Sequence, residues 1–274
     1  MLTRTIPGSG EALPLIGLGT YRAFDAGASA AERTALAEVL KTLVARGGRM
    51  VDSSPMYGRA EGVVGDLQAQ LGLRPQLFLA TKVWTSGRDA GIRQMQRSLQ
   101  SMQAGTMDLM QIHNLVDVHT HTATLEEWKR QGTVRYLGIT HYHEGAHSEL
   151  ERLIATRRYD FVQLNYCMAE RTAERRLLPL ARETGVAVIV NRPFARASLL
   201  SRVRGKALPP WAAEFDCSSW SQFFLKYVVS HPAVTCAIPA TSEPAHMLNN
   251  AMAGDGRLPD ELMRVRMVRY FESL

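Results

Sequence analysis

The chain has 274 residues, of which 46% are hydrophobic and 21% are charged, and its formal net charge is +6. This composition excludes a disordered chain, a collagen and a disulfide scaffold. The three cysteines, Cys167, Cys217 and Cys236, lack a metal-type spacing and favour a reducing compartment. Because residues 1–10 also lack the apolar segment of a signal peptide, we expect a cytoplasmic protein.

The charge and hydropathy patterns argue against two kinds of partner. No apolar run approaches the ~18 residues that a membrane span needs. Only five of the 32 basic residues are lysines, and the arginines are scattered, which is typical of a solvated surface. We therefore expect neither a membrane nor a nucleic-acid partner. An anionic cofactor better explains a local excess of positive charge, and the sequence does not indicate the oligomeric state.

The chain opens with a predicted hairpin, whose strands over 3–6 and 12–13 flank a turn at 7–10. The first helix has a capping box at Ser29 and Glu32, and Thr124 and Glu127 repeat that box. Eight apolar runs predict strands over 15–18, 50–52, 77–81, 109–112, 136–139, 161–164, 186–190 and 234–238. Helices are expected near 29–46, 60–71, 89–103, 124–131, 144–156, 170–184, 219–230 and 243–252, with a last helix over 259–273.

Eight strand–helix repeats predict a closed (β/α)8 TIM barrel that occupies residues 1–274 as a single domain. The N-terminal β-hairpin would close the bottom of the barrel, and the extra C-terminal helix would pack outside it. A doubly wound sheet is the alternative fold, and it normally shows a GxGxxG motif after the first strand. Here Gly17 and Gly19 supply the first two glycines and the third is missing.

Chemistry in such a barrel sits at the carboxyl ends of the strands, which here carry Asp52, Tyr57, Lys82 and His113. Tyrosine is a poor acid at neutral pH because its pKa is ~10. A lysine ammonium beside the phenol lowers that pKa, an aspartate keeps the lysine charged, and a histidine orients a carbonyl oxygen. Taken singly, each residue is more often structural than catalytic, but four of them on adjacent strand ends favour proton transfer.

An ordered set of motifs resembles the aldo-keto reductases over nearly the whole chain. It is carried by residues 17–20, 48–61, 81–82, 108–114, 132–140, 163–166 and 238–239. The resemblance implies a (β/α)8 fold and hydride transfer from a reduced nicotinamide, usually NADPH, to an aldehyde or ketone. It also implies that Tyr57 is the acid, that Lys82 and Asp52 tune it, and that His113 orients the substrate.

The same resemblance implies a set of cofactor-binding positions. Gly19, Thr20 and Tyr21 match the loop under the nicotinamide ribose, which Asp52 also touches. Thr140 and His141 stand in the place of a Ser-Asn pair that binds the carboxamide. The remaining matches are Gln163, at the carboxamide, and Asn250, at the adenine.

Two cofactor segments depart from the family pattern. Asn191 replaces an aromatic residue that stacks on the nicotinamide, so Arg192 and Phe194 are the alternative stacking partners. After Pro239, the usual lysine and arginine that clamp the 2′-phosphate are Ala240 and His246. Thr241, Ser242 and the following helix N-terminus remain as anion donors. We expect NADPH to be preferred, with NADH tolerance open.

The residues do not identify which carbonyl compound is the substrate. Tyr21, Phe24, Trp84 and Asn114 are candidates for lining the substrate pocket. A non-catalytic nicotinamide-binding sensor on the same fold is the alternative function, because fold alone does not establish turnover.

The segment His143-Glu144-Gly145-Ala146-His147 matches the H-E-x-x-H pattern of zinc metallopeptidases. However, it follows a strand directly and contains a glycine, whereas a zinc site needs both histidines on one helix. We therefore expect no metal.

Overall fold

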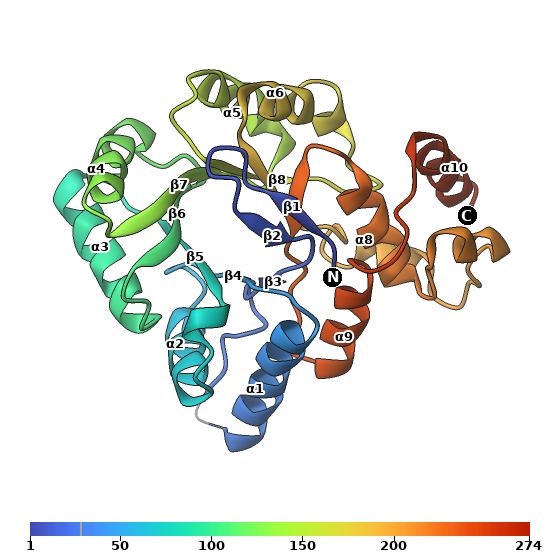
Figure 1. The fold of residues 1–274 in the computed structure, drawn as a ribbon, viewed down its shortest axis with the longest axis horizontal. Helices are drawn as coiled ribbons and strands as arrows, with labels where there is room; N and C mark the ends of the chain where they lie inside the picture. Colours follow the sequence, from blue (N-terminus) through green and yellow to red (C-terminus); the bar gives the residue numbers. More distant parts are fainter. Residues whose placement is uncertain (28) are drawn as a thin grey trace.

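The computed structural model describes residues 1–27 and 29–274. Eight parallel strands form the sheet of a (β/α)8 barrel, and neighbours along the chain are neighbours in the sheet (Figure 1). The strands are β3 (Leu18–Gly19), β4 (Met50–Asp52), β5 (Phe78–Val83), β6 (Met107–His113), β7 (Val134–Thr140), β8 (Phe161–Asn165), β9 (Ala187–Asn191) and β10 (Val234–Ala237). The predicted barrel is confirmed.

The ring closes where the segment around β3 meets the end of β10. Ile16 bridges Ala237, and Gly19 bridges Ala240. A side chain at Gly19 would bring its Cβ to 2.7 Å from the Ile238 carbonyl oxygen, so only glycine allows this approach. The sequence predicts the first strand over 15–18, but regular pairing is limited to β3 because the closure uses isolated bridges.

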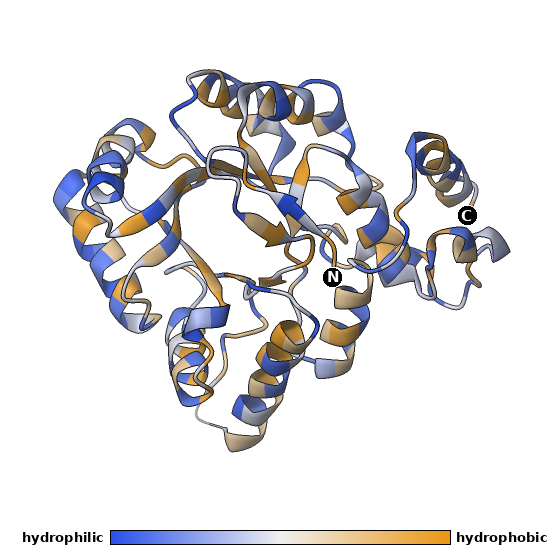
Figure 2. Cartoon of the chain, in the orientation of Figure 1, coloured by the Kyte–Doolittle hydropathy of each residue, from blue (hydrophilic) through white to orange (hydrophobic). Residues whose placement is uncertain are grey.

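Helices surround the barrel, with polar residues outward and apolar residues toward the strands (Figure 2). The main ones are α1 (Ala30–Ala45), α2 (Ala60–Gln70), α3 (Arg88–Ser101), α4 (Val118–Arg130), α5 (His147–Ala155), α6 (Leu177–Thr184), α8 (Trp220–Ser230) and α9 (Pro244–Met252). The last helix, α10 (Glu261–Glu272), packs outside the ring beside the short α7 (Ser198–Arg202). In the described part of the chain, no helix is long and apolar enough to cross a membrane.

Strands β1 (Thr3–Thr5) and β2 (Ala12–Pro14) form the expected antiparallel hairpin. Figure 1 shows it lying across one end of the barrel. Ile6 and Leu13 are fully buried there, in a cluster that includes Met50, Phe78 and Phe161 from the barrel strands. The hairpin therefore closes the amino-terminal end of the barrel and leaves the carboxyl ends of the strands open.

Three helix boundaries differ from the sequence prediction. Helix α4 begins at Val118, and Thr124 lies inside it with its hydroxyl donating to the Thr120 carbonyl oxygen at 3.2 Å, so the capping-box assignment is wrong. Short 3-10 turns precede α5 and α6, which shortens both helices. By contrast, the predicted N-cap of α1 is confirmed, because the Ser29 hydroxyl accepts from the Glu32 amide.

Candidate active site

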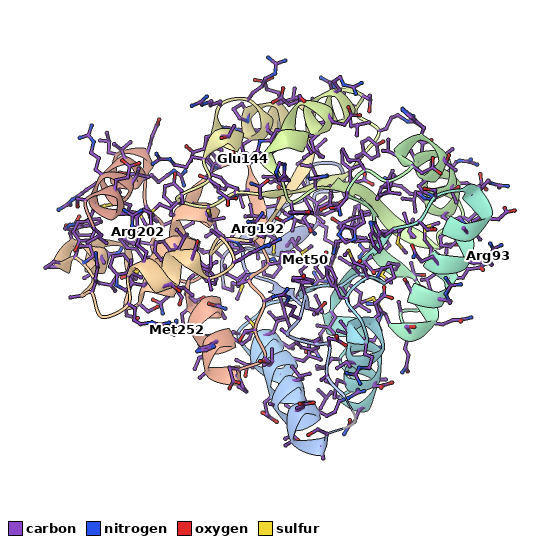
Figure 3. The ribbon with its side chains drawn as sticks, turned by 180° about the vertical axis from the view of Figure 1, so that it is seen from behind. Met50, Arg93, Glu144, Arg192, Arg202 and Met252 are labelled. Atoms are coloured by element: carbon purple, nitrogen blue, oxygen red, sulfur yellow. The ribbon has the colours of Figure 1, made fainter. Side chains whose placement is uncertain are left out.

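A cavity of about 640 Å³ opens at the carboxyl ends of the strands. Figure 3, drawn from the side opposite the hairpin, shows Arg192 near the middle of the molecule at this end of the barrel. The site residues expected from the sequence that line the cavity are Gly19, Thr20, Tyr21, Asp52, Tyr57, Trp84, His113, Asn114, Thr140, Gln163, Asn191, Arg192, Phe194, Pro239, Thr241, His246 and Asn250. The topology thus brings together residues from all eight barrel strands or the loops after them.

Lys82 and Asp52 form a fully buried ion pair at the base of the cavity. Lys82 Nζ lies 2.6 Å from Asp52 Oδ2 and 2.6 Å from the Ser53 carbonyl oxygen. Burial alone lowers the pKa of Lys82, but Asp52 and Tyr57 raise it, and the net direction is upward. The ammonium therefore stays charged at neutral pH, as the residue types on β4 and β5 predict.

The second oxygen of Asp52 accepts from two buried amides. Gln111 Nε2 lies 3.0 Å and Gln163 Nε2 lies 2.9 Å from Asp52 Oδ1. Both oxygens of this buried carboxylate therefore accept hydrogen bonds, which offsets the cost of burying its charge. Gln111 is a supporting residue that the sequence reasoning missed, although its alternation with His113 on β6 places both on the barrel interior.

Tyr57 lies between the ion pair and the cavity. Lys82 Nζ lies 4.9 Å from the centroid of the Tyr57 ring, and the Tyr21 ring packs edge-on at 5.0 Å. Burial raises the pKa of the phenol and the Lys82 ammonium lowers it, with burial the larger effect, so that pKa lies above its ordinary value. Lys82 does lower the pKa of the phenol, as predicted, but burial raises it by more. The phenol is therefore protonated at neutral pH.

His113 lies beside this phenol, with the two ring centroids 5.9 Å apart. Its Nδ1 lies 3.0 Å from Ser54 Oγ, which accepts from the Met56 amide at 3.4 Å. Burial, with the charges of Lys82 and His141, lowers the pKa of His113 to about 2. The imidazole is therefore neutral and acts as a hydrogen-bonding group rather than as a proton reservoir.

The ends of β7, β8 and β9 bring a second polar group to the cavity. Gln163 Oε1 accepts from Thr140 Oγ1 at 3.3 Å and from Asn191 Nδ2 at 3.4 Å. His141 contributes its backbone, because its carbonyl oxygen accepts from Asn191 Nδ2 at 3.3 Å, while its ring stacks on Tyr142 outside the cavity lining. The expectation that the His141 side chain lines the site is therefore corrected.

The far end of the cavity lies between the loops after β9 and β10. Thr241 and Asn250 are buried there, and the Thr241 hydroxyl accepts from the Glu243 amide at 3.0 Å. Ser242 is exposed and does not line the cavity. Arg196, which the sequence reasoning missed, does line it, and its place in a loop that follows a strand is the signal that could have found it.

One residue predicted to line the substrate pocket lies elsewhere. Phe24 is fully buried in the hydrophobic core rather than in the cavity, so it is not a pocket residue. Met56 and Tyr142 line the cavity instead.

The H-E-x-x-H segment is split, because His143 precedes a 3-10 turn and only His147 lies in α5, where its Nε2 faces Asn165 Oδ1 at 3.1 Å. Within residues 1–27 and 29–274, no group of three or more His, Cys, Asp or Glu could hold a metal ion.

Comparison with known proteins adds independent findings. A family model described as "Aldo/keto reductase family" matches residues 15–265. Methylglyoxal reductase YeaE of Escherichia coli is 29% identical over 259 residues, which cover 92% of this chain and 89% of that protein. Glyoxal reductase of Bacillus subtilis is 24% identical, with 93% and 88% covered. An aldo-keto reductase structure from Klebsiella pneumoniae in complex with NADPH is 26% identical, covers 99% of this chain and 96% of its own, and has a TM-score of 0.80.

Proposed function

This chain belongs to the aldo-keto reductase family and is an NADP(H)-dependent reductase of carbonyl compounds, and we propose that the cavity at the open end of its barrel is the active site. The observation that carries the proposal is the contact of the Tyr57 ring with the buried Lys82–Asp52 pair on the cavity wall. A protonated phenol next to a fixed cation is the arrangement that a general acid needs.

The polar groups of the cavity fit a nicotinamide dinucleotide. Thr140, Gln163 and Asn191 gather amide and hydroxyl groups at one place, which suits a carboxamide. Arg192 and Arg196 are the cationic residues in the lining, and Asp52, already paired with Lys82, is its acidic one among the described residues. This excess of positive charge suits the cofactor's phosphates. NADPH bound there supplies the hydride.

The protein's own groups then handle the proton. Tyr57 donates its hydroxyl proton to the carbonyl oxygen, and the Lys82 ammonium stabilises the phenolate that is left. In the tautomer in which the Ser54 hydroxyl donates to His113 Nδ1, the imidazole carries its proton on Nε2 and offers an N–H to the same carbonyl oxygen. Asp52 keeps Lys82 charged and in place.

We further propose that the substrates are small aldehydes that carry a second carbonyl group. Two of the relatives are named for methylglyoxal and glyoxal. Tyr21, Met56 and Trp84 form an aromatic and apolar wall beside Tyr57, and each is more than a third exposed. Such an open mouth suits small, hydrated substrates rather than one enclosed ligand.

The proposal also covers the setting of the protein. All three cysteines are buried and free, and burial raises the pKa of the Cys167 thiol to about 11. Free thiols fit the reducing cytoplasm. We also propose that residues 1–274 form one barrel domain.

The test is NADPH oxidation by the purified chain, followed with methylglyoxal, glyoxal and a series of larger aldehydes. We expect turnover with the dicarbonyl compounds and a lower kcat/KM as the aldehyde grows. Tight NADPH binding without turnover on any of these carbonyls would favour the nicotinamide-binding sensor instead.

A further inference from the structure

We propose that the side-chain oxygen of Asn191 accepts a hydrogen bond from the primary amide of the nicotinamide. Asn191 would thereby fix the ring by a polar contact at the end of β9. The inference rests on the proposed function, because it assumes that the cavity binds a nicotinamide dinucleotide.

The argument starts at Asp52, because its carboxylate can only accept hydrogen bonds. Gln163 must therefore turn its Nε2 toward Asp52 Oδ1, at 2.9 Å, and Gln111 Oε1 accepts from the same nitrogen at 3.2 Å. This orientation sends Gln163 Oε1 in the opposite direction, where Thr140 Oγ1 donates to it at 3.3 Å. The charge of Asp52 thus sets the direction of the next amide.

The same constraint passes to Asn191. Its side chain faces two acceptors, Gln163 Oε1 at 3.4 Å and the His141 carbonyl oxygen at 3.3 Å. Both require a donor, so Nδ2 must point toward them and Oδ1 must point away. The orientation of this amide is therefore fixed by its surroundings, although nitrogen and oxygen have nearly the same shape.

Oδ1 of Asn191 is buried and has no hydrogen-bond partner among the described residues. Asn191 also lines the cavity. An unpaired buried acceptor is unfavourable, and a ligand that brings an N–H group removes this penalty. The primary amide of nicotinamide has such a group.

The position of His141 explains why the side-chain amide that would bind the nicotinamide comes from β9. Its ring nitrogen Nδ1 accepts from the His143 amide at 3.2 Å, and the ring stacks on Tyr142 with centroids 5.4 Å apart. The side chain is thereby directed away from the site. The end of β7 therefore offers no side-chain amide, and Asn191, hydrogen-bonded to the His141 carbonyl oxygen, supplies one from two strands away.

The experiment compares two cofactors that differ at one group. In 3-acetylpyridine adenine dinucleotide phosphate, a methyl group replaces the amide nitrogen of NADP⁺ while the carbonyl stays. Dissociation constants for both are measured by calorimetry in the wild type, in Asn191→Ala and in Asn191→Leu, which keeps the side-chain volume. Circular dichroism checks that each variant is folded.

We expect the wild type to bind NADP⁺ about tenfold more tightly than the analogue, the effect of one hydrogen bond to a buried acceptor. In both Asn191 variants that ratio should fall to within twofold. Asn114→Ala is the matched control, because Asn114 Oδ1 is also buried, unpartnered among the described residues and in the cavity, but stands beside His113. This variant should keep the wild-type ratio.

The outcomes separate the two proposals. A wild-type ratio that survives in Asn191→Ala and Asn191→Leu, or that is lost in Asn114→Ala alone, overturns the role of Asn191 and leaves the reductase function intact. A folded wild type that binds neither dinucleotide overturns the proposed active site itself.

Discussion

At the scale of single residues, the rest of the site depends on the Asp52–Lys82 ion pair, because its charges orient the groups around it. Both partners are fully buried, and the carboxylate also holds Gln111 and Gln163. A buried ion pair contributes little net stability, but removing one partner leaves an uncompensated charge. The pair is therefore best tested by breaking it and then removing the second charge.

We predict that Lys82→Met abolishes carbonyl reduction and lowers the free energy of unfolding by ~3 kcal/mol. Adding Asp52→Asn removes the stranded carboxylate and should restore at least half of that loss, without restoring activity. Urea unfolding and NADPH oxidation measure the two effects. A Lys82→Met protein as stable as the wild type would show that Asp52 does not depend on Lys82 for its charge.

Tyr57 can be tested by deleting a single atom. Tyr57→Phe keeps the ring, and its packing on Tyr21, while removing the acidic hydroxyl. We predict that carbonyl reduction falls by ~10² or more, with an unchanged dissociation constant for NADPH. Tyr159→Phe is the control, because Tyr159 is a buried tyrosine bonded to Thr122 outside the cavity. Activity within threefold of the wild type in Tyr57→Phe would exclude Tyr57 as the proton donor.

The pH dependence follows from two shifted groups. The pKa of Tyr57 is raised by burial, so the reductive direction keeps its acid at alkaline pH. The pKa of His113 is about 2, so this imidazole does not titrate near neutrality. We predict that the single-turnover rate of reduction is flat between about pH 6 and about pH 9 and declines only above pH ~10, because the pKa of Tyr57 lies above that of a free phenol. An inflection near pH ~6.5 would mean that His113 changes charge during the reaction.

At the scale of elements, the loops after the strands make the site. The loop after β9 holds Arg192, Ala195, Arg196 and Ala197 with φ values of 52°, 47°, 55° and 70°. Non-glycine residues rarely adopt this left-handed conformation. The tight curl keeps the segment over the cavity, where Arg192 donates to the Tyr142 carbonyl oxygen at 2.8 Å.

The loop after β10 contrasts with this cationic loop. Ala240 is exposed and carries no charge, and the Thr241 hydroxyl accepts a hydrogen bond from the Glu243 amide. We predict that the wild type prefers NADPH over NADH by only about 10–100-fold, because charge-assisted contacts to the 2′-phosphate are missing. Ala240→Lys with His246→Arg should tighten NADPH and leave NADH almost unchanged.

Dissociation constants for both cofactors, from quenching of protein fluorescence, decide this prediction. A wild type that already binds NADPH more than a thousandfold better than NADH would show that other residues, with Arg196 the first candidate, recognise the 2′-phosphate.

The sequence predicts some of these elements better than others. The strands are recognised because they are buried on both faces and read as apolar runs. Boundaries fail where local patterns are ambiguous, as at Thr124, whose hydroxyl bonds back inside α4. The side chains proposed as catalytic follow directly from the strand ends. The position of Phe24 could not be predicted, because an aromatic residue in a loop packs equally well in a core or a pocket. The position of Arg196 could not be predicted either, because it depends on the backbone conformation of the loop after β9.

The whole molecule separates stability from chemistry at opposite ends of the barrel. The hairpin closes one end, where Tyr136 Oη donates to Ser9 Oγ at 2.7 Å, and Ile6 and Leu13 enter the apolar cluster. The charged and polar side chains that line the cavity stand at the other end. In barrels of this kind, the amino-terminal face serves stability and the carboxyl-terminal face serves catalysis.

We therefore predict that Ile6→Ala lowers the free energy of unfolding by ~2–5 kcal/mol, because it leaves a hole in a fully buried cluster. The dissociation constant for NADPH and the kcat/KM for aldehyde reduction should stay within twofold of the wild type. Leu262→Ala is the control, since Leu262 is 81% exposed on α10 and its truncation should cost less than ~0.5 kcal/mol. Urea unfolding measures the stability of both variants. If Ile6→Ala weakens NADPH binding as much as it destabilises the fold, strain at the hairpin reaches the cavity, and the two ends of this barrel are coupled through its strands.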